Sequence, residues 1–201
     1  MAAPTPLIAV RKLALVRGTR TLFDRLDLDL RAGELLHLKG ANGAGKTSLL
    51  EALAGLRPAA EGTIEAPAES ESLHWIGHRN GLSAALTPME NLRFWCGINQ
   101  APADAIVPAL ERLGVASLRH RPCRTLSAGQ KRRSSLARLL VARRPLWLLD
   151  EPLDGLDAAG LATFGNLLGE HLASGGGAVV TSHQSLPVGL LNVRTIVLGQ
   201  P

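Results

Sequence analysis

The chain has 201 residues, of which 46% are hydrophobic and 19% charged, and its formal net charge is +5. This length accommodates one large domain spanning residues 1–201 and is too short for two domains of that size. No apolar run approaches the ~20 residues that cross a bilayer. Arg11 and Lys12 interrupt the apolar stretch 7–15, so we expect neither a transmembrane helix nor a cleaved signal peptide.

The first part of the chain predicts a hairpin followed by a strand, a glycine-rich loop and a helix. Residues 7–17 and 21–30 alternate apolar and polar side chains around a Gly-Thr-Arg turn, which is typical of an antiparallel hairpin. Residues 34–39 predict a strand that enters the loop, and the leucine spacing in 47–56 predicts a helix. Strand, loop and helix in this order are the setting of a phosphate-binding loop.

The middle of the chain changes to a helical pattern. Residues 62–65 and 72–77 predict two short strands, which we interpret as a shortened β-hairpin. From residue 87 to about 119 the apolar spacing is helical, and Thr87-Pro88-Met89-Glu90 matches a capping box with proline at the first helical position. We predict a helical subdomain over about 86–142, between core segments 1–85 and 143–201.

The last part of the chain predicts a helix over 128–142, a buried strand over 146–149 and a helix over 158–173. A second buried strand over 177–182 leads directly to His183, and one final strand follows. The expected fold class is therefore α/β, with a mostly parallel core sheet, an N-terminal antiparallel β subdomain and the helical subdomain.

The segment 40–47 matches the phosphate-loop pattern G-x-x-x-x-G-K-S/T at every fixed position. Its glycines allow successive backbone N–H groups to turn inward as an anion-binding nest at a helix N-terminus. Lys46 adds a positive charge for the β- and γ-phosphates, and the hydroxyl of Thr47 suits Mg²⁺. The candidate ATP-binding residues of this segment are Gly40, Ala41, Asn42, Gly43, Ala44, Gly45, Lys46, Thr47 and Ser48.

Asp150 and Glu151 end a strand that is hydrophobic throughout, as strands buried on both faces are. Ligands of parallel sheets collect at the carboxyl edge of the strands, where these two acids are expected to lie. His183 follows another apolar strand, so we expect it at the same edge.

A third motif, Leu126-Ser127-Ala128-Gly129-Gln130, stands between the phosphate loop and the paired acids. The three motifs together resemble those of the ATP-binding-cassette (ABC) ATPases. The resemblance implies the phosphate-loop ABC ATPase fold and ATP hydrolysis with Mg²⁺. It implies that Asp150 holds Mg²⁺ through a water, as Thr47 does directly, that Glu151 is the general base, and that His183 contacts the γ-phosphate, with Lys46 as the third catalytic residue.

The same resemblance implies that two copies of the chain form one enzyme. In the family's geometry the helix after the pentapeptide cannot reach its own chain's nucleotide, so Ser127, Ala128, Gly129 and Gln130 would contact ATP bound to a second copy. Asp157 matches a loop that crosses between the two copies. The expected assembly is a head-to-tail dimer with two ATP molecules at its interface.

Nearly the full length resembles the ATPase subunits of the cytochrome c maturation (Ccm) ABC complex, long described as a haem exporter. The matching stretches are 17–23, 75–82, 86–92 and 126–139, with Trp147 and His183-Gln184 in addition. This resemblance implies integral membrane subunits as partners, no direct contact with the cargo, and a peripheral location on the cytoplasmic face of a bacterial inner membrane.

The sequence departs from the general ABC pattern at three places. Arg17 stands near the place of the usual aromatic ring on adenine, and its guanidinium could stack on a base. His78 and Arg79 occupy the site of the glutamine that couples ATP hydrolysis to the membrane subunits, and Ala128 replaces the more usual glycine.

Two other readings of the chain stay open. The segment from Arg112 to Trp147 holds ten Lys or Arg and no Asp or Glu, which fits either a solvated helix or a surface for phosphate, acidic lipid or nucleic acid. The basic segment gives slight support to a soluble ABC ATPase acting on nucleic acid, which is the less favoured alternative. The nearer alternative is the ATPase of another small ABC exporter. The cysteines Cys96 and Cys123 have no metal-ligand neighbours and are expected to be reduced thiols.

Overall fold

The computed structural model describes residues 6–66 and 72–199. A three-stranded antiparallel sheet has the order β2–β1–β4, and a five-stranded sheet has the order β5–β6–β7–β3–β8 with every neighbouring pair parallel. The strands are β1 Ile8–Arg17, β2 Arg20–Leu30, β3 Leu35–Lys39, β4 Glu61–Glu65, β5 Leu73–Ile76, β6 Leu146–Asp150, β7 Gly177–Thr181 and β8 Val193–Val197. The helices are α1 Lys46–Leu53, α2 Pro88–Asn99, α3 Ile106–Arg112, α4 Ala128–Leu136, α5 Arg138–Val141 and α6 Ala158–Ala173, with 3₁₀ turns at Ala103–Ala105, Ala116–Leu118 and Cys123–Thr125.

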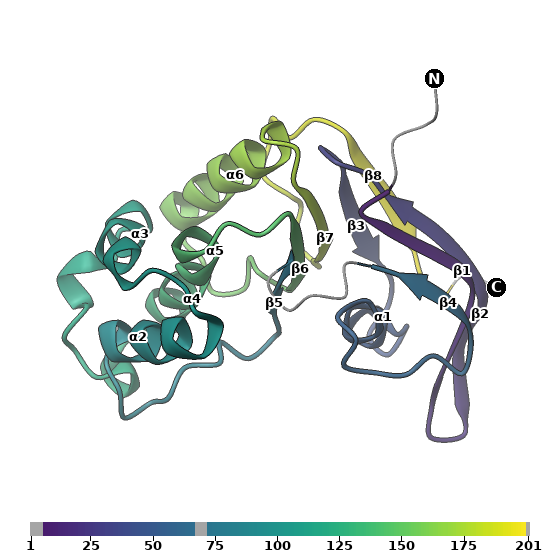
Figure 1. The fold of residues 1–201 in the computed structure, drawn as a ribbon, viewed down its shortest axis with the longest axis horizontal. Coiled ribbons are helices and arrows are strands. Elements are labelled where there is room, and N and C mark those ends of the chain that lie inside the picture. Colours follow the sequence, from purple (N-terminus) through teal and green to yellow (C-terminus); the bar gives the residue numbers. More distant parts are fainter. Residues whose placement is uncertain (1–5, 67–71, 200–201) are drawn as a thin grey trace.

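The parallel sheet is covered on both faces. Figure 1 shows it between α1 and the antiparallel sheet on one side and the helices α4 to α6 on the other. Alternating side chains of β6 divide between the two apolar clusters: Leu146 and Leu148 face α1, whereas Trp147 and Leu149 face the helices. This explains why the parallel strands read as continuous apolar runs, and the predicted α/β fold class is confirmed.

The interpretation of residues 62–65 and 72–77 as a hairpin is wrong. β4 pairs antiparallel with β1, and β5 pairs parallel with β6, so the two segments belong to different sheets. The reason is burial: β5 places Ile76 in the apolar cluster on one face of the parallel sheet and Leu73 and Trp75 against the cluster on the other, which a two-stranded hairpin cannot do. Most of the predicted linker, 67–71, lies outside the described residues.

The helical segment follows the predicted pattern with more interruptions. The capping box at the start of α2 is present, because the Thr87 hydroxyl accepts from the Glu90 N–H while the Glu90 carboxylate accepts from the Thr87 N–H. The helix predicted over 128–142 is two elements, α4 and α5, that meet at Ala137, and Ala142 is already extended. The helix predicted over 47–56 ends at Leu53, where Gly55 turns the chain with a positive φ of 72°. The subdomain boundaries themselves stay a prediction.

The basic segment 112–147 is not uniformly solvated. Arg132 and Arg144 are 2% and 9% exposed, and their guanidinium groups donate to backbone carbonyls. Cys96 and Cys123 are both buried, and neither forms a disulfide with another described residue.

Candidate functional site

The phosphate loop lies between β3 and α1 in a conformation that requires glycine. Gly40 has a φ of 145°, and a Cβ there would lie 2.6 Å from the carbonyl oxygen of Leu198. Lys46 is 8% exposed, and its Nζ donates to the carbonyl oxygens of Gly40 at 2.7 Å and Ala41 at 3.3 Å. The ammonium group is therefore held over its own loop, where it would meet a bound phosphate.

Asp150 ends β6 at the carboxyl edge of the sheet, as predicted, and both of its carboxylate oxygens accept hydrogen bonds. The Thr47 hydroxyl donates to Oδ2 at 2.9 Å, and the Thr181 hydroxyl at the end of β7 donates to Oδ1 at 2.7 Å. The structure thus brings the phosphate loop and the first of the paired acids into direct contact.

Glu151 adopts an unusual backbone conformation with φ of 48°, which is uncommon for a residue with a side chain. Its N–H donates to Thr181 Oγ1 at 2.9 Å. Its carboxylate turns toward His183, whose N–H donates to Oε2 at 3.1 Å and whose Nε2 lies 3.5 Å from Oε1. Oε1 is buried and accepts no hydrogen bond from the described residues. One oxygen of the acid is thus fixed, and the other is available as a proton acceptor.

The pentapeptide forms the N-terminus of α4. Ser127 is the N-cap, its hydroxyl accepts from the Gln130 N–H at 3.2 Å, and the Gln130 side chain accepts from the Ser127 N–H at 2.9 Å. This capping box was not predicted, although its S-x-x-Q pattern was visible in the sequence.

The pentapeptide also touches the loop after the paired acids. A Cβ at Gly129 would lie 2.4 Å from the carbonyl oxygen of Gly155, whereas Ala128 is exposed. Asp157 caps α6 by accepting from the Gly160 N–H at 2.8 Å, and it lies 3.8 Å from Arg133 of α4. Alanine is therefore tolerated at 128, and glycine is required at 129.

The hairpin of β1 and β2 reaches the phosphate loop through a residue that sequence reasoning missed. A guanidinium nitrogen of Arg20 lies 4.0 Å from the position that a Cβ of Gly43 would occupy, and Phe23 lies against Gly45. Arg17 is exposed at the end of β1 and pairs with Arg20 across the turn. Its contact with adenine stays a prediction.

His78 and Arg79 are exposed, but their flanking residues are held tightly. Arg132 Nη1 donates to the carbonyl oxygen of Gly77 at 3.1 Å and to Asn80 Oδ1 at 3.2 Å, and Ser135 Oγ donates to the Asn80 carbonyl at 2.7 Å. Sequence reasoning missed Arg132, because it stands in a run of three cations that reads as a solvated helix face.

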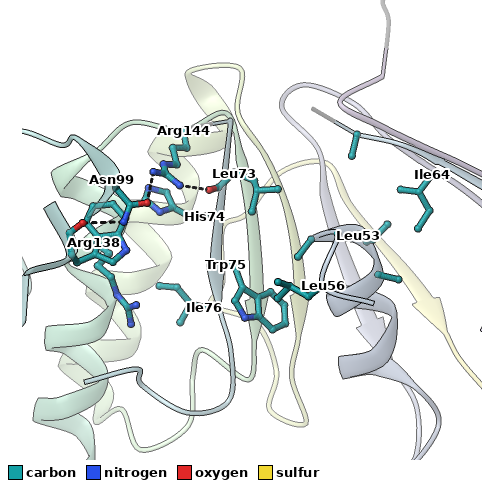
Figure 2. A pocket seen from close by; sticks show the side chains of 15 residues that line it. Leu53, Leu56, Ile64, Leu73, His74, Trp75, Ile76, Asn99, Arg138 and Arg144 are labelled. Atoms are coloured by element: carbon teal, nitrogen blue, oxygen red, sulfur yellow. Dashed lines mark hydrogen bonds between the residues drawn. The ribbon is translucent and has the colours of Figure 1, made fainter. Parts of the chain in front are cut away.

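A groove of about 660 Å³ lies between the end of α1 and the helical segment. Figure 2 shows Leu53, Leu56 and Ile64 on one side of Trp75, and Asn99 and Arg144 on the other. Trp95 completes this wall, with the guanidinium of Arg144 5.3 Å from its ring centre.

Burial sets the protonation state of His74, which lines this groove. His74 is 3% exposed, its Nε2–H donates to the Ala142 carbonyl at 2.7 Å, and desolvation lowers its pKa to about 3. His74 is therefore neutral at physiological pH.

A phosphate loop that opens onto two acids at the carboxyl edge of a parallel sheet defines the phosphate-loop nucleotide hydrolases. Residues 23–154 match the model of the ABC transporter family, and the chain belongs to that family. It is accordingly an ATP-binding subunit that hydrolyses ATP.

Relatives of nearly equal length carry one name. The chain is 40% identical over 209 residues to the cytochrome c biogenesis ATP-binding export protein CcmA of Hahella chejuensis, covering 99% of each chain. It is 47% identical over 192 residues to the protein of that name from Cereibacter sphaeroides, covering 96% of this chain and 89% of that one.

Solved structures agree on the fold. An ATP-binding subunit of an ABC transporter superposes with a TM-score of 0.81 at 22% identity, covering 88% of this chain and 79% of that one. An ABC transporter ATP-binding protein from Pyrococcus furiosus gives a TM-score of 0.81 at 21% identity, covering 95% and 96%. None of the helices in the described part of the chain has the length and apolar character needed to span a membrane.

Proposed function

We propose that the chain is the ATP-hydrolysing subunit of a membrane complex for c-type cytochrome biogenesis, bound peripherally to the cytoplasmic face of a bacterial inner membrane. The names of its relatives support the pathway. The observation that carries the enzymatic part is the buried Glu151 carboxylate, with one oxygen fixed by His183 and the other without a hydrogen-bond donor among the described residues.

The nucleotide phosphates would lie against the backbone N–H groups of residues 40–48, where the α1 dipole favours negative charge. Lys46 would exchange its bonds to the loop carbonyls for phosphate oxygens, and Arg17 would stack on the base. The loop N–H groups and Arg17 would chiefly serve binding, whereas Lys46 would also stabilise the negative charge on the phosphate oxygens as the γ-phosphate is transferred.

Thr47 and Asp150 suit Mg²⁺, because both offer oxygen ligands and their side chains are already within hydrogen-bond distance. Among the described residues no group of three or more His, Cys, Asp or Glu could hold a metal by itself, so phosphate oxygens would complete this site. When bound, Mg²⁺ supplies positive charge against the phosphate oxygens.

Glu151 would act on the water that attacks the γ-phosphate. Its Oε1 accepts a proton as the new bond between the water oxygen and phosphorus forms and the bond to the β-phosphate oxygen breaks. His183 would orient the carboxylate through its backbone N–H and approach the γ-phosphate with its exposed ring.

A second copy of the chain would complete each site. In the described residues the Ser127 and Gln130 side chains cap their own helix, and Ser127 and Ala128 at its N-terminus are exposed, so N–H groups there could bind an anion. Ser127, Ala128, Gly129 and Gln130 would contact the ATP of the other copy, and Asp157 would lie beside the crossing. ATP would thereby join the copies, and hydrolysis would release them.

The membrane subunits would dock at the groove between α1 and the helical segment. The groove is lined mostly by apolar and aromatic side chains, among them Leu56, which is 64% exposed. Phe94 and Ile98 of α2, the helix that contributes Trp95 to the groove, are 68% and 66% exposed. Exposed apolar side chains of this kind suit a helix of a partner protein. His78 and Arg79 would report the state of the site to that partner, and the chain itself would not contact the cargo.

Replacing Glu151 with Gln tests the enzymatic proposal. The amide keeps the size of the side chain but cannot accept the proton, so we expect steady-state ATP hydrolysis to fall by at least about 100-fold while ATP-bound dimers accumulate. Light scattering with and without ATP would show the dimer. Normal turnover in this variant would remove Glu151 from the role.

Purification from membranes tests the partners. The tagged chain, extracted with its membrane subunits, should bring down integral membrane proteins that handle haem or cytochrome c. Membrane subunits of an unrelated exporter would favour the alternative of another small ABC exporter. Recovery of nucleic acid without any membrane protein would favour a soluble ABC ATPase.

A further inference from the structure

We propose that Arg132 is a positioning residue for Glu151. Through Arg132, helix α4 of each copy sets the orientation of that copy's own catalytic base. This inference rests on the role of Glu151 proposed above. It concerns a residue that lies outside the phosphate loop, the paired acids and the pentapeptide.

Arg132 is 2% exposed and makes five hydrogen bonds to two separate segments, 150–152 and 77–80. Nη2 donates to the carbonyl oxygens of Asp150 at 2.8 Å and Glu151 at 2.5 Å, and Nε donates to that of Pro152 at 3.2 Å. Nη1 donates to the carbonyl oxygen of Gly77 at 3.1 Å and to Asn80 Oδ1 at 3.2 Å.

All five acceptors are uncharged oxygens, which is unusual for a buried cation. Burial lowers the pKa of Arg132, while the charges of Asp154, Asp150 and Glu151 raise it. Burial of a planar guanidinium group with five N–H donors is compensated only where those donors find acceptors. Here the guanidinium fits three successive carbonyls at the end of β6.

The conformation of Glu151 is held in part by one of these contacts. Its φ of 48° lies in the left-handed region, which a residue with a Cβ keeps only when its surroundings hold it there. The Thr181 hydroxyl holds the N–H of Glu151, and Arg132 holds its carbonyl oxygen. These two contacts together fix the direction in which the Glu151 carboxylate leaves the backbone.

Arg132 connects this backbone to the helix that would contact the partner's nucleotide. It stands in α4, whose N-cap is Ser127. If binding of the second ATP shifts α4, the shift would therefore act on the Glu151 carbonyl and on the segment 77–80 through the same guanidinium. Glu151 would be correctly oriented only when α4 is in contact with the ATP of the other copy.

The test compares Arg132→Lys and Arg132→Gln with the neighbouring control Lys131→Gln, in the full-length chain. A lysine ammonium is a single point donor and cannot reach both the 150–152 carbonyls and the 77–80 segment. We expect kcat to fall by about 10- to 100-fold in both Arg132 variants, while the dissociation constant for ATP changes by less than about 2-fold because the phosphate loop is intact. Lys131→Gln should keep both values.

A second arm uses Glu151→Gln. If Arg132 acts through Glu151, adding Arg132→Lys to Glu151→Gln should lower single-turnover hydrolysis no further. The proposal is overturned if the two substitutions multiply their effects on single-turnover hydrolysis, or if Arg132→Lys leaves kcat unchanged. It is also overturned if kcat and ATP binding fall together in proportion to the fraction of folded protein. Absence of ATP hydrolysis in the unmodified chain would instead contradict the proposed function.

Discussion

The Thr181 hydroxyl donates a hydrogen bond of 2.7 Å to Asp150 Oδ1, across two neighbouring parallel strands. The Thr181 hydroxyl oxygen in turn accepts a hydrogen bond from the Glu151 N–H at 2.9 Å. Because Thr47 Oγ1 donates to the other oxygen of Asp150, this carboxylate joins the phosphate loop to β7. The paired acids are therefore held by a residue that belongs to none of the three motifs.

Thr181→Val should weaken both the fold and the site. Valine matches threonine in shape but leaves the buried Glu151 N–H and Asp150 Oδ1 without this partner, which should cost about 2 to 4 kcal/mol of unfolding free energy. Thr181→Ser keeps the hydroxyl and should lose about 1 kcal/mol. Urea unfolding measures both. Equal stability of the two variants would show that the hydroxyl is dispensable.

Gly129→Ala sets helix propensity against packing. Alanine in the first turn of α4 should by itself add up to about 1 kcal/mol of stability. The new Cβ would lie 2.4 Å from a backbone oxygen of Gly155, however, so we expect a net loss of about 1 to 3 kcal/mol and weaker ATP-driven dimerisation. Ala128→Gly is the comparison variant, because residue 128 is exposed and the change should cost up to about 1 kcal/mol through helix propensity alone. A stabilised Gly129→Ala variant would refute the packing argument.

Arg79→Gln should keep or improve ATP hydrolysis. The side chain of Arg79 is exposed, and its segment is held by contacts to Gly77 and Asn80 that the substitution leaves in place. The stability change should stay within about 0.5 kcal/mol. ATPase assays with the chain alone and with its membrane subunits would measure the effect. Complete loss of coupled function would show that Arg79 has a task of its own.

His74 should make the fold sensitive to acid. Its pKa falls from an ordinary value near 6.5 to about 3 on folding, chiefly through desolvation. The unfolded chain therefore binds a proton that the folded chain does not, and stability is full above pH 6.5 and falls toward pH 3, by up to about 1.4 kcal/mol per pH unit.

His74→Gln should reduce this slope in urea unfolding between pH 7.5 and pH 5. Some slope should remain, because burial also lowers the pKa of His37 and His171. Identical pH profiles for the two proteins would mean that His74 is protonated in the folded state.

The short motifs could be predicted from the sequence because each acts through adjacent backbone. A phosphate loop needs its glycines in consecutive turns, and a capping box closes within four residues, so both are visible without tertiary structure. The position of the paired acids could also be predicted, because they follow an apolar strand. A strand buried on both faces belongs to a parallel sheet, and the residues that follow it lie at the carboxyl edge of that sheet.

Contacts between distant segments could not be predicted in this way. The strands β4 and β5 are neighbours in sequence, but burial assigns them to different sheets. Lys131, Arg132 and Arg133 are three consecutive cationic residues that the sequence does not distinguish. A helix turns about 100° per residue, however, so their side chains point to different surroundings. Only the tertiary structure could decide that the middle one enters the core.

The sequence by itself thus determined that this chain binds and hydrolyses ATP, because that chemistry resides in contiguous motifs. The tertiary structure decided how the paired acids are held, through Thr181 and Arg132, because their orientation depends on hydrogen bonds between segments that meet only after folding.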